Sequence, residues 1–258
     1  MIEHNKIYFE DTYDTLKRCP DRSVDLFLQD TPFGVTQNEW DVEPDLEKMW
    51  PEWLRVGKRN CAFLFFATEP FASTLVKSNP SIFRYDLIWD KSQCTGFLNA
   101  NKMPLRTHES IMVFYRELPT YNPQKLKGKL QKKSTGGASK NYNKFDYRPH
   151  FSEEYFPKSI IPNFPQVREE DGHPTQKPVD LIRYLVKTYS NEGEVVFDGY
   201  MGRGTTALAC VAEKRIFIGS ENNKEFFLKC SSNVDEVLSK QLLDFKGKSI
   251  QTITSKNL

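Results

Sequence analysis

The sequence predicts an α/β fold in which a doubly wound sheet of seven strands carries helices on both faces. Seven short apolar runs are separated by helical patterns or helix-length connections, as such a sheet requires. Four acids, Asp11, Asp30, Asp198 and Glu221, stand at the ends of four of these runs. Doubly wound sheets bind ligands beyond the carboxyl ends of their strands, so we expect the acids to meet at one rim. The predicted strands are residues 6–10, 24–29, 61–67, 85–89, 110–115, 194–198 and 215–220.

Composition narrows the class of protein. The chain has 258 residues, of which 38% are hydrophobic and 13% aromatic, and its net charge is +2. This length suits one large α/β domain with an insertion, and an anionic partner would have to meet a local basic patch. The sequence has no signal peptide and no membrane-spanning run, so we expect a cytoplasmic protein. Its cysteines and histidines are scattered, which predicts reduced thiols and no metal site. They are Cys19, Cys61, Cys94, Cys210 and Cys230, with His4, His108, His150 and His173.

Helical patterns fill the connections in the first half of the chain. Residues 46–56 place Leu46, Trp50 and Trp53 on one face, which is typical of a helix packed on a sheet. The run 61–67 is apolar enough to be a strand buried on both faces. Two shorter helices and one loop rich in Asn, Lys and Gly are also predicted, at residues 12–17, 70–78 and 91–107 respectively.

A basic insert interrupts the pattern after Pro119. Residues 120–150 contain eight basic side chains and one acid, with aromatic residues between them. Cations interleaved with aromatics suit a nucleic-acid backbone with bases to stack on; the alternative is a disordered basic loop without a ligand. The predicted DNA-binding residues are Lys125, Lys127, Lys129, Lys132, Lys133, Lys140 and Lys144 here, with Lys102 and Arg106 in the preceding loop.

The second half contains a predicted nucleotide pocket. The strand 194–198 is followed by Gly199, Gly202 and Gly204 and then by a helix that opens with Thr205 and Thr206. Glycines let a backbone approach a nucleotide closely, and a helix start offers free N–H donors. No lysine follows the glycines, which argues against a Walker-type phosphate loop. A dinucleotide site and an ordinary tight turn remain alternatives for this motif.

Helices also flank this pocket on both sides in the sequence. An amphipathic pattern over 177–190 leads into the pocket strand, and a long final helix over 226–238 follows Glu221. Glu221 ends the next strand, where an acid is placed to bind ribose hydroxyls. Residues 246–258 are expected to be a polar, frayed tail.

The turn Asp30–Gly34, DTPFG, predicts an acceptor site for a planar base. The Asp30 carboxylate can accept one N–H of an exocyclic amine, a turn carbonyl can accept the other, and Phe33 can stack on the ring. This would align a weak neutral nucleophile with an electrophile without a covalent enzyme intermediate. The methyl group of the sulfonium S-adenosylmethionine suits a pocket of ribose-binding acids. An ordinary Asp-Pro turn is the alternative.

Together the motifs resemble the β-class amino-methyltransferases of DNA, which methylate adenine N6 or cytosine N4. The order of motifs matches: DTPFG, the basic insert, HPTQKP (173–178), FDGYMGRGTT (197–206) and GSENNKEFF (219–227). The stretch 95–115, TGFLNANKMPLRTHESIMVFY, is similar to a branch found in phages and bacteria. The resemblance covers almost all of the chain except its final tail.

The resemblance implies a Rossmann-like methyltransferase fold in which the acceptor motif precedes the cofactor motifs, a circular permutation. It implies S-adenosylmethionine as cofactor and double-stranded DNA as substrate, with the target base flipped out. A homodimer and a cognate restriction nuclease are left open as partners. Implied catalytic residues are Asp30, Pro32 and Phe33. Implied cofactor contacts are Asp11, Asp30, Lys177, Asp198, Tyr200, Gly202, Gly204, Thr205, Thr206, Glu221 and Asn222. The expected organisation is 1–118 (acceptor half), 119–172 (insert), 173–245 (cofactor half) and 246–258 (tail).

Two motifs depart from the family pattern. The usual acceptor motif is D-P-P-Y, so Thr31 is expected to loosen the turn, while Phe33 keeps a stacking face. The usual cofactor motif begins D-P-F, so Gly199 is expected to make the strand end flexible and to weaken cofactor binding. Asp30 favours adenine, because the cytosine branch usually has serine there.

Three other functions compete with adenine methylation. A cytosine N4 methylase would use the same motifs. A nicotinamide oxidoreductase would use the glycines but give DTPFG no role, and a degenerate homologue would bind DNA without binding the cofactor. RNA methylation is disfavoured by the motif order.

Overall fold

The computed structural model describes the chain except for residues 1, 35–40, 134–149, 162–163, 166–175 and 255–258. Contacts divide the chain into two compact units, which are described separately below. The larger unit comprises Met1–Asn122 and Ile160–Leu258, and the smaller comprises Pro123–Ser159.

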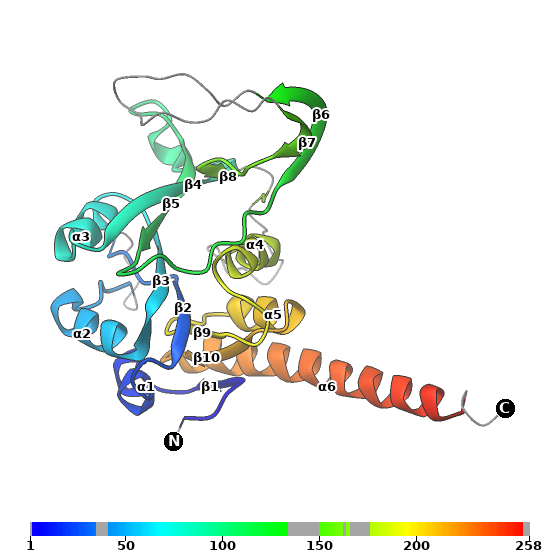
Figure 1. Ribbon diagram of the computed structural model, residues 1–258. Helices are drawn as coiled ribbons and strands as arrows, with labels where there is room; N and C mark the ends of the chain where they lie inside the picture. Colours follow the sequence, from blue (N-terminus) through cyan, green and yellow to red (C-terminus); the bar gives the residue numbers. More distant parts are fainter. Residues whose placement is uncertain (1, 35–40, 134–149, 162–163, 166–175, 255–258) are drawn as a thin grey trace. The chain divides into compact units, whose positions relative to one another are not determined.

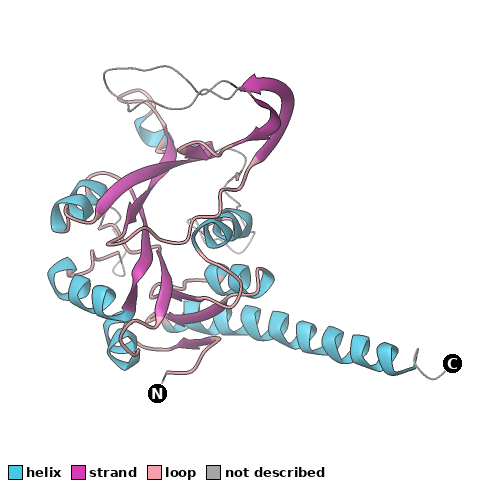
Figure 2. Ribbon diagram, viewed as in Figure 1, coloured by secondary structure: helices cyan, strands magenta, loops and turns pink. Residues whose placement is uncertain are grey.

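The larger unit is built on a mixed sheet whose order is β1-β10-β9-β2-β3-β5-β4-β8 (Figure 2). β5 runs antiparallel to its neighbours β3 and β4, and every other adjacent pair is parallel. All seven predicted strands are present, and the short β8 adds an eighth. The strands are β1 (Lys6–Tyr8), β2 (Val24–Gln29), β3 (Gly57–Ala67), β4 (Phe83–Thr95), β5 (Arg106–Phe114), β8 (Ile160–Ile161), β9 (Val195–Asp198) and β10 (Ile216–Ser220).

Helices cover both faces of this sheet, three on each side (Figure 1). Leu26 and Leu28 of β2 pack toward the cluster that contains α4, α5 and the start of α6, whereas Phe27 packs toward α1, α2 and α3. Alternate strand residues therefore serve two cores, which confirms the doubly wound class. The helices are α1 (Thr12–Arg18), α2 (Leu46–Val56), α3 (Phe71–Ser78), α4 (Val179–Tyr189), α5 (Thr205–Ala212) and α6 (Lys224–Thr254).

β3 lies at the centre of both clusters, as its sequence predicts. All residues from Cys61 to Ala67 are at most 1% exposed. Phe63 and Phe65 face α2, where the ring of Trp50 packs edge-on against both. Full burial of each such phenylalanine contributes on the order of 2 kcal/mol, so this strand anchors the sheet.

The predicted loop 91–107 is mostly a hairpin. β4 continues to Thr95 and β5 begins at Arg106, and these two residues are paired in the ladder. A single 3₁₀ turn, η1 (Phe97–Asn99), lies at the tip. The Asn- and Lys-rich composition predicted a loop here, but polar side chains are also compatible with strands that extend beyond the body of the sheet.

The smaller unit contains a two-stranded antiparallel ladder that the sequence interpretation missed. β6 (Leu126–Lys133) pairs with β7 (His150–Tyr155), with Leu126 opposite Tyr155 and Lys133 opposite His150. Gly128 lies under the Tyr155 ring, where an added Cβ would approach the ring to 2.4 Å. The residues that join the two strands, 134–149, lie outside the described part of the chain.

The carboxyl-terminal helix is longer than predicted. α6 extends to Thr254, so residues 246–254 are helical rather than a frayed tail. In the described residues, no helix combines the length and apolar character needed to cross a lipid bilayer.

Candidate active site at the carboxyl edge of the sheet

The two motifs that the sequence singled out meet at one edge of the sheet. β1, β10, β9 and β2 are consecutive parallel neighbours, so their carboxyl ends share that edge. Asp30 directly follows β2, Asp198 ends β9, and Glu221 directly follows β10. The expected convergence at one rim is therefore confirmed for Asp30, Asp198 and Glu221.

A pocket with about 440 Å³ of non-atom space, part of it open to solvent, lies at this edge. Asp30 and Gly202 both line it, so the acceptor turn and the glycine turn share one site. Of the predicted site residues, Asp30, Lys177, Asp198, Tyr200, Gly202, Thr205 and Thr206 line the pocket. Sequence reasoning missed the lining residues Leu28, Phe66, Gln176, Ile182, Met201 and Arg203. Asp11, Pro32, Phe33, Gly204, Glu221 and Asn222 are not among its lining residues.

Gln29 joins the two halves of the site. Its Nε2 atom donates to the carbonyl oxygen of Phe197 at 2.8 Å, and its Oε1 atom accepts the N–H of Gly199 at 3.3 Å. The side chain is fully buried, so these bonds also satisfy its polar atoms. A polar residue at the last position of an apolar strand was the available sequence signal.

The glycine turn owes its shape to left-handed backbone at two residues. Gly202 has φ 51° and Gly204 has φ 85°, and α5 begins immediately afterwards at Thr205. An added Cβ on Gly204 would lie 2.7 Å from the Sγ atom of Cys230 on α6. Glycine at 204 is therefore required both by φ and by the close approach of α6.

Glu221 holds this turn in place through backbone contacts. Its Oε2 atom accepts the Gly202 N–H at 2.8 Å, and its Oε1 atom accepts the Asn223 N–H at 2.8 Å. Burial raises the pKa of the Glu221 carboxyl, while the N–H groups of Asn223 and Gly202 oppose that shift. Glu221 thus stabilises the glycine turn without lining the pocket itself.

Asp198 is almost completely buried beside the pocket, with 3% of its surface exposed. Burial raises the pKa of its carboxyl to about 7, against the stabilising hydrogen bonds from Thr206 and the backbone of Tyr200. Its Oδ1 atom accepts the Tyr200 N–H at 2.9 Å. The charges of Asp30 and Glu221 raise the pKa of Asp198 further.

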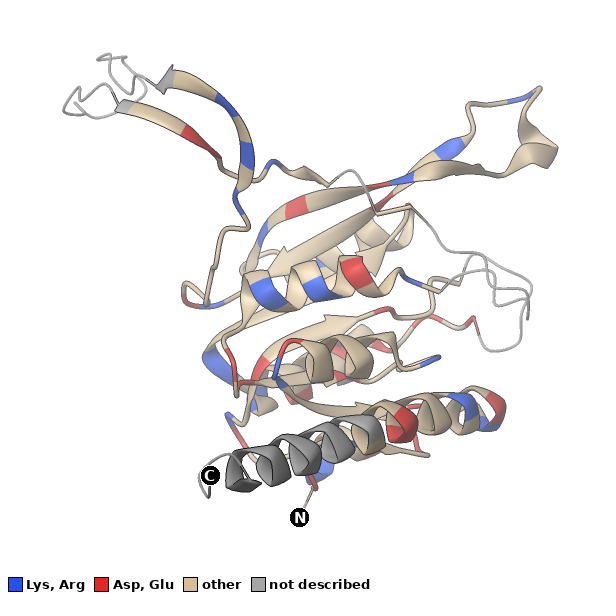
Figure 3. Cartoon of the chain, turned by 90° about the vertical axis from the view of Figure 1, so that its right-hand side faces the viewer, with Lys and Arg blue, Asp and Glu red and all other residues tan. Residues whose placement is uncertain are grey.

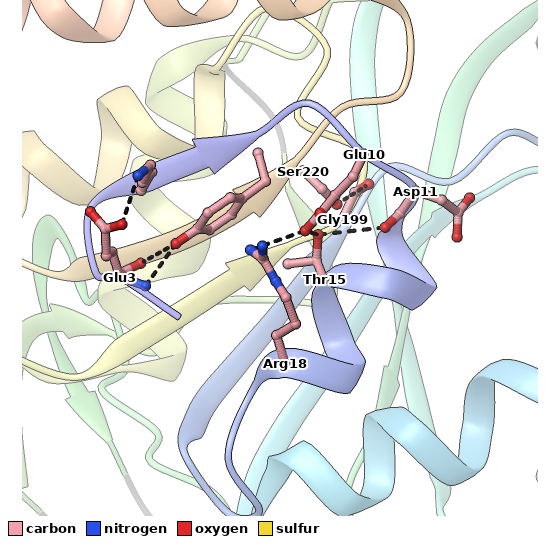
Figure 4. A network of polar contacts seen from close by, with 9 residues as sticks. Glu3, Glu10, Asp11, Thr15, Arg18, Gly199 and Ser220 are labelled. Carbon is pink, nitrogen blue, oxygen red and sulfur yellow. Dashed lines mark hydrogen bonds and ion pairs between the residues drawn. The ribbon is translucent and has the colours of Figure 1, made fainter. Parts of the chain in front are cut away.

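Asp11 is an exposed N-cap of α1. Its Oδ1 atom accepts the N–H of Tyr13 at 2.8 Å. Figure 4 shows it beside Glu10, which accepts from Thr15 at 2.7 Å and pairs with Arg18 at 3.1 Å. Backbone N–H groups thus bind three of the four rim acids, Asp11, Asp198 and Glu221.

Gly199 is tightly enclosed, which contradicts the expected flexibility. A Cβ added there would lie 1.8 Å from Oγ1 and 2.7 Å from Cβ of Thr12 on α1. Its carbonyl oxygen accepts the Ser220 hydroxyl at 3.2 Å (Figure 4), and its N–H donates to Gln29. Glycine is present here because α1 packs directly on the end of β9.

The acceptor turn is held by a residue that sequence reasoning missed. Asp41 Oδ1 accepts the N–H groups of Phe33 and Gly34 at 2.8 and 3.0 Å. Thr31, expected to loosen the turn, is 2% exposed. Phe33 is partly buried and stacks on Phe71, with ring centroids 5.7 Å apart. No feature of the sequence marked Asp41 as the partner of this turn.

Lys177 reaches the acceptor acid. Its Nζ atom lies 2.8 Å from both carboxylate oxygens of Asp30 and 3.3 Å from Oε2 of Glu109 on β5. Burial alone would lower the pKa of Lys177, but the charges of Asp30 and Glu109 raise it above its usual value. Burial raises the pKa of Asp30, and the Lys177 charge opposes this. Lys177 is therefore a cation at neutral pH.

The predicted DNA-binding residues fall in both units. In the larger unit, Lys102 and Arg106 are exposed at the β4–β5 hairpin, which also carries Phe97 and Leu98, 78% and 83% exposed. In the smaller unit, Lys127 and Lys129 are exposed on β6 and Lys125 just before it, where Lys125 pairs with Glu154 of β7 at 2.8 Å. Figure 3 shows basic residues on one strand of this pair and acidic residues on the other. The side chains of Lys132 and Lys133, and all of Lys140 and Lys144, lie outside the described part of the chain.

Within the described residues, no group of three or more His, Cys, Asp and Glu side chains is arranged to hold a metal ion. His173, of the HPTQKP motif, lies outside them.

Comparisons with known proteins agree with this geometry. The chain is 26% identical over 255 residues to the type II methyltransferase M1.MboII of Moraxella bovis, covering 88% of this chain and 95% of that protein. It is 28% identical over 245 residues to the DNA adenine methyltransferase YhdJ of Escherichia coli, covering 87% and 80% respectively.

Solved structures share the fold at lower identity. The M1.HpyAVI–SAM complex superposes with a TM-score of 0.59 at 20% identity, covering 88% of this chain and 98% of that one. The PvuII DNA methyltransferase (cytosine-N4-specific) gives a TM-score of 0.63 at 12% identity, covering 93% of each chain. A family model for N6/N4 methyltransferases, described as DNA methylase, matches residues 24–230. Because that match spans most of the chain, this protein belongs to the N6/N4 DNA methylase family.

Proposed function

We propose that this protein transfers the methyl group of S-adenosylmethionine to the N6 amine of an adenine that is flipped out of double-stranded DNA. The observation that carries the proposal is the shared pocket, in which Asp30 of the acceptor turn and Gly202 of the glycine turn line one cavity. Family membership supports methyl transfer to an exocyclic amine in DNA.

The pocket has the features that S-adenosylmethionine would need. It lies at the carboxyl edge of the parallel strands, where sheets of this class bind ligands. Gln176 Oε1, on the pocket wall, is buried and has no hydrogen-bond partner among the described residues, so a polar ligand would satisfy it. An added Cβ on Gly202 would meet nothing within 4 Å, which leaves room for a ligand beside the turn.

Two parts of the pocket would bind the cofactor. The start of α5, Thr205 and Thr206, presents backbone N–H groups and hydroxyls, and Asp198 presents a carboxyl beside them. When bound, S-adenosylmethionine supplies an electrophilic methyl group on a cationic sulfur. The Asp30 carboxylate, and Asp198 in its ionised form, would attract that cation.

Asp30 would act on the acceptor. Its carboxylate accepts one N–H of the adenine amine and directs the nitrogen lone pair toward the methyl carbon. S-adenosylmethionine, when bound, would supply the methyl group, and Asp30 would hold the amine proton until it passes to water. Lys177, bonded to both Asp30 oxygens, would fix the plane of the carboxylate during this step.

Adenine is proposed over cytosine on two grounds. Aspartate at position 30 is typical of the adenine branch in the family pattern, and YhdJ, a relative over most of the chain, is named a DNA adenine methyltransferase. Cytosine N4 is the alternative target, favoured by the fold likeness to the PvuII enzyme.

The β4–β5 hairpin and the smaller unit would bind the DNA. Exposed cations on both can neutralise backbone phosphates, and Phe97 and Leu98 offer apolar surface to unstacked bases. A second copy of the chain and a cognate nuclease remain predictions from the resemblance.

Transfer of a labelled methyl group to DNA tests the proposal, with sequencing that reports modified bases to give the target. We expect label at adenine N6, and Asp30→Asn should remove it while cofactor binding, measured by calorimetry, persists. Asp21→Asn is the matched control, because Asp21 is 72% exposed and neither it nor its ion-pair partner Arg55 lines the pocket. Label at cytosine N4 would select the alternative target. Absence of both label and cofactor binding would indicate a degenerate homologue.

A further inference from the structure

A row of charged side chains runs from the acceptor acid into the sheet. Lys177 binds Asp30 and also lies 3.3 Å from Glu109, and Glu109 in turn lies 3.2 Å from the Nζ atom of Lys91. Their side chains are 7% exposed for Lys177, 12% for Glu109, 5% for Lys91 and 31% for Asp30. We call these four residues the buried charge network.

The network joins four separate elements of the fold. Asp30 follows β2, Lys177 precedes α4, Glu109 lies on β5, and Lys91 lies on β4. Charges alternate in sign along the row, so each ion has an opposite neighbour. Removing ions from water is costly, and such a row persists only where each member is paired.

The geometry around Lys177 restricts what its ammonium group can do. Two of its three N–H donors are directed to the two oxygens of Asp30, and the remaining one is available to Glu109. The Nζ atom also lies 5.0 Å from the centroid of the Phe66 ring. The lysine is therefore held on several sides, and through it the Asp30 carboxylate has a fixed orientation.

Glu109 divides its own carboxylate between two lysines. Oε1 faces Lys91 and Oε2 faces Lys177. Burial would raise the pKa of Glu109, but the charges of Lys177 and Lys91 hold it below its usual value, so Glu109 is an anion at neutral pH. Lys91 thus keeps Glu109 charged, and Glu109 is the second anion that contacts the Lys177 ammonium group.

We infer that Glu109 and Lys91 are positioning residues for methyl transfer: acting through Lys177, they set the orientation and the charge of the Asp30 carboxylate. This inference rests on the function proposed above. Neither residue lines the pocket, so neither is expected to touch the base or the cofactor.

The inference predicts a definite pH effect. The charged groups that act on Asp30 are Lys177 and Glu109, with Asp198 across the pocket. Glu109 raises the pKa of Asp30, so Glu109→Gln should lower it. Asp30 works as a carboxylate, and activity is lost as the pH falls through its pKa. The acidic limb of the rate profile should therefore move to lower pH in Glu109→Gln.

The experiment compares Glu109→Gln with Glu109→Asp and the control Glu117→Gln. Glu117 forms an exposed pair with Arg59, so the control makes the same chemical change outside the network. Rates are measured per cofactor-binding site, so loss of folded protein does not count. We expect Glu109→Gln to lower kcat by about tenfold or more, to leave both KM values within about twofold, and to shift the acidic limb. Glu109→Asp keeps the charge and should recover part of kcat without the shift.

Lys91→Met tests the network from its other end, and its effect alone can be measured even if Glu109→Gln does not fold. It should lower kcat in the natural sequence, and its effect in a Glu109→Gln background should be much smaller, because Lys91 acts through Glu109. Additive effects of the two changes would contradict the inference. So would a Glu109→Gln enzyme with natural kcat per site and an unshifted acidic limb.

A measurement that does not depend on methyl transfer tests this inference separately from the proposed function. The carboxyl ¹³C resonance of Asp30, assigned by its loss in Asp30→Asn, can be titrated in both proteins. A lower pKa in Glu109→Gln supports the coupling even if the natural protein transfers no methyl group, and an unchanged pKa overturns it.

Discussion

The Nζ atom of Lys177 lies 2.8 Å from each carboxylate oxygen of Asp30, although 147 positions separate the two residues in the chain. The contact brings the segment before α4 onto the end of β2. It places a cation beside the acid that would receive the target amine, so the charge state of Asp30 depends on Lys177.

Replacing Lys177 by methionine should make the enzyme sensitive to mild acid. The Lys177 charge lowers the pKa of Asp30, so its removal lets burial and Glu109 raise that pKa. One pKa unit is about tenfold in the ionised fraction at pH below the pKa. We expect the acidic limb of kcat to move to higher pH, opposite to Glu109→Gln. A rate profile between about pH 5 and pH 8 checks it, and a parallel loss of rate at every pH would contradict it.

Ionisation of Asp198 should lower the free energy of unfolding as the pH rises from mildly acidic to mildly alkaline. Its pKa is raised to about 7 in the folded chain, so the folded state binds a proton that the unfolded state has released. Stability from this group is present below the unfolded pKa and is lost as pH rises through 7. Between pH 5.5 and pH 8 the free energy of unfolding should fall by about 2 kcal/mol on its account.

Denaturant unfolding of the natural protein and Asp198→Asn at both pH values measures this effect. Asparagine can still accept the Tyr200 N–H, so the change mainly removes the titration. The pH-dependent difference between the two proteins should be about 2 kcal/mol, and equal slopes with pH would refute the assignment to Asp198.

Much of the sheet could be predicted because its strands are short apolar runs with an acid at the end. β2, β3, β9 and β10 follow the predicted bounds to within a few residues, and Asp30 and Asp198 lie where strand ends place them. These features depend on local pattern and on the rule that parallel strands share a carboxyl edge. What the sequence pattern does not give is the order of the strands in the sheet, and therefore which strands are neighbours.

The parts that could not be predicted depend on contacts distant in the chain. Lys91 lies two residues after one predicted strand and Glu109 directly precedes the next, yet only the pairing of β4 with β5 brings them together. β6 was missed because its lysines break the alternation that marks a strand with one buried face. Asp41 binds the acceptor turn, and no sequence motif predicts this contact.

Gly199→Ala should destabilise the protein through Thr12. The new methyl carbon would lie 1.8 Å from Thr12 Oγ1, so α1 or β9 must shift. Overpacking of this kind costs about 1–3 kcal/mol. Thermal unfolding should show a smaller cost in a Thr12→Ala background, which removes the nearer atom. Equal costs in both backgrounds would mean that Thr12 is not the obstacle.

Gly202→Ala tests the cost of backbone strain alone, without the steric clash expected for Gly199→Ala. Gly202 has φ 51° but open space where a Cβ would be, so alanine there is strained without a collision. We expect a cost of about 1 kcal/mol that Thr12→Ala does not relieve.

The hairpin tip should contribute to DNA binding without contributing to stability. Phe97 and Leu98 are 78% and 83% exposed, so replacing both by alanine removes little buried surface and should change the free energy of unfolding by less than about 0.5 kcal/mol. They share the β4–β5 hairpin with the cations Lys102 and Arg106, and an unstacked base could contact their exposed surfaces.

Replacing the apolar side chains of the hairpin and replacing its basic side chains should have different effects on DNA binding. Phe97→Ala with Leu98→Ala should weaken binding of an intact duplex several-fold, and a duplex with a mismatch at the target base should restore it, because less unstacking is then required. Lys102→Ala with Arg106→Ala should weaken both duplexes equally and reduce the salt dependence of binding by about two phosphate contacts. Fluorescence titrations at two salt concentrations distinguish these outcomes. If the alanine pair at 97 and 98 bound both duplexes like the natural protein, the tip would have no part in opening DNA.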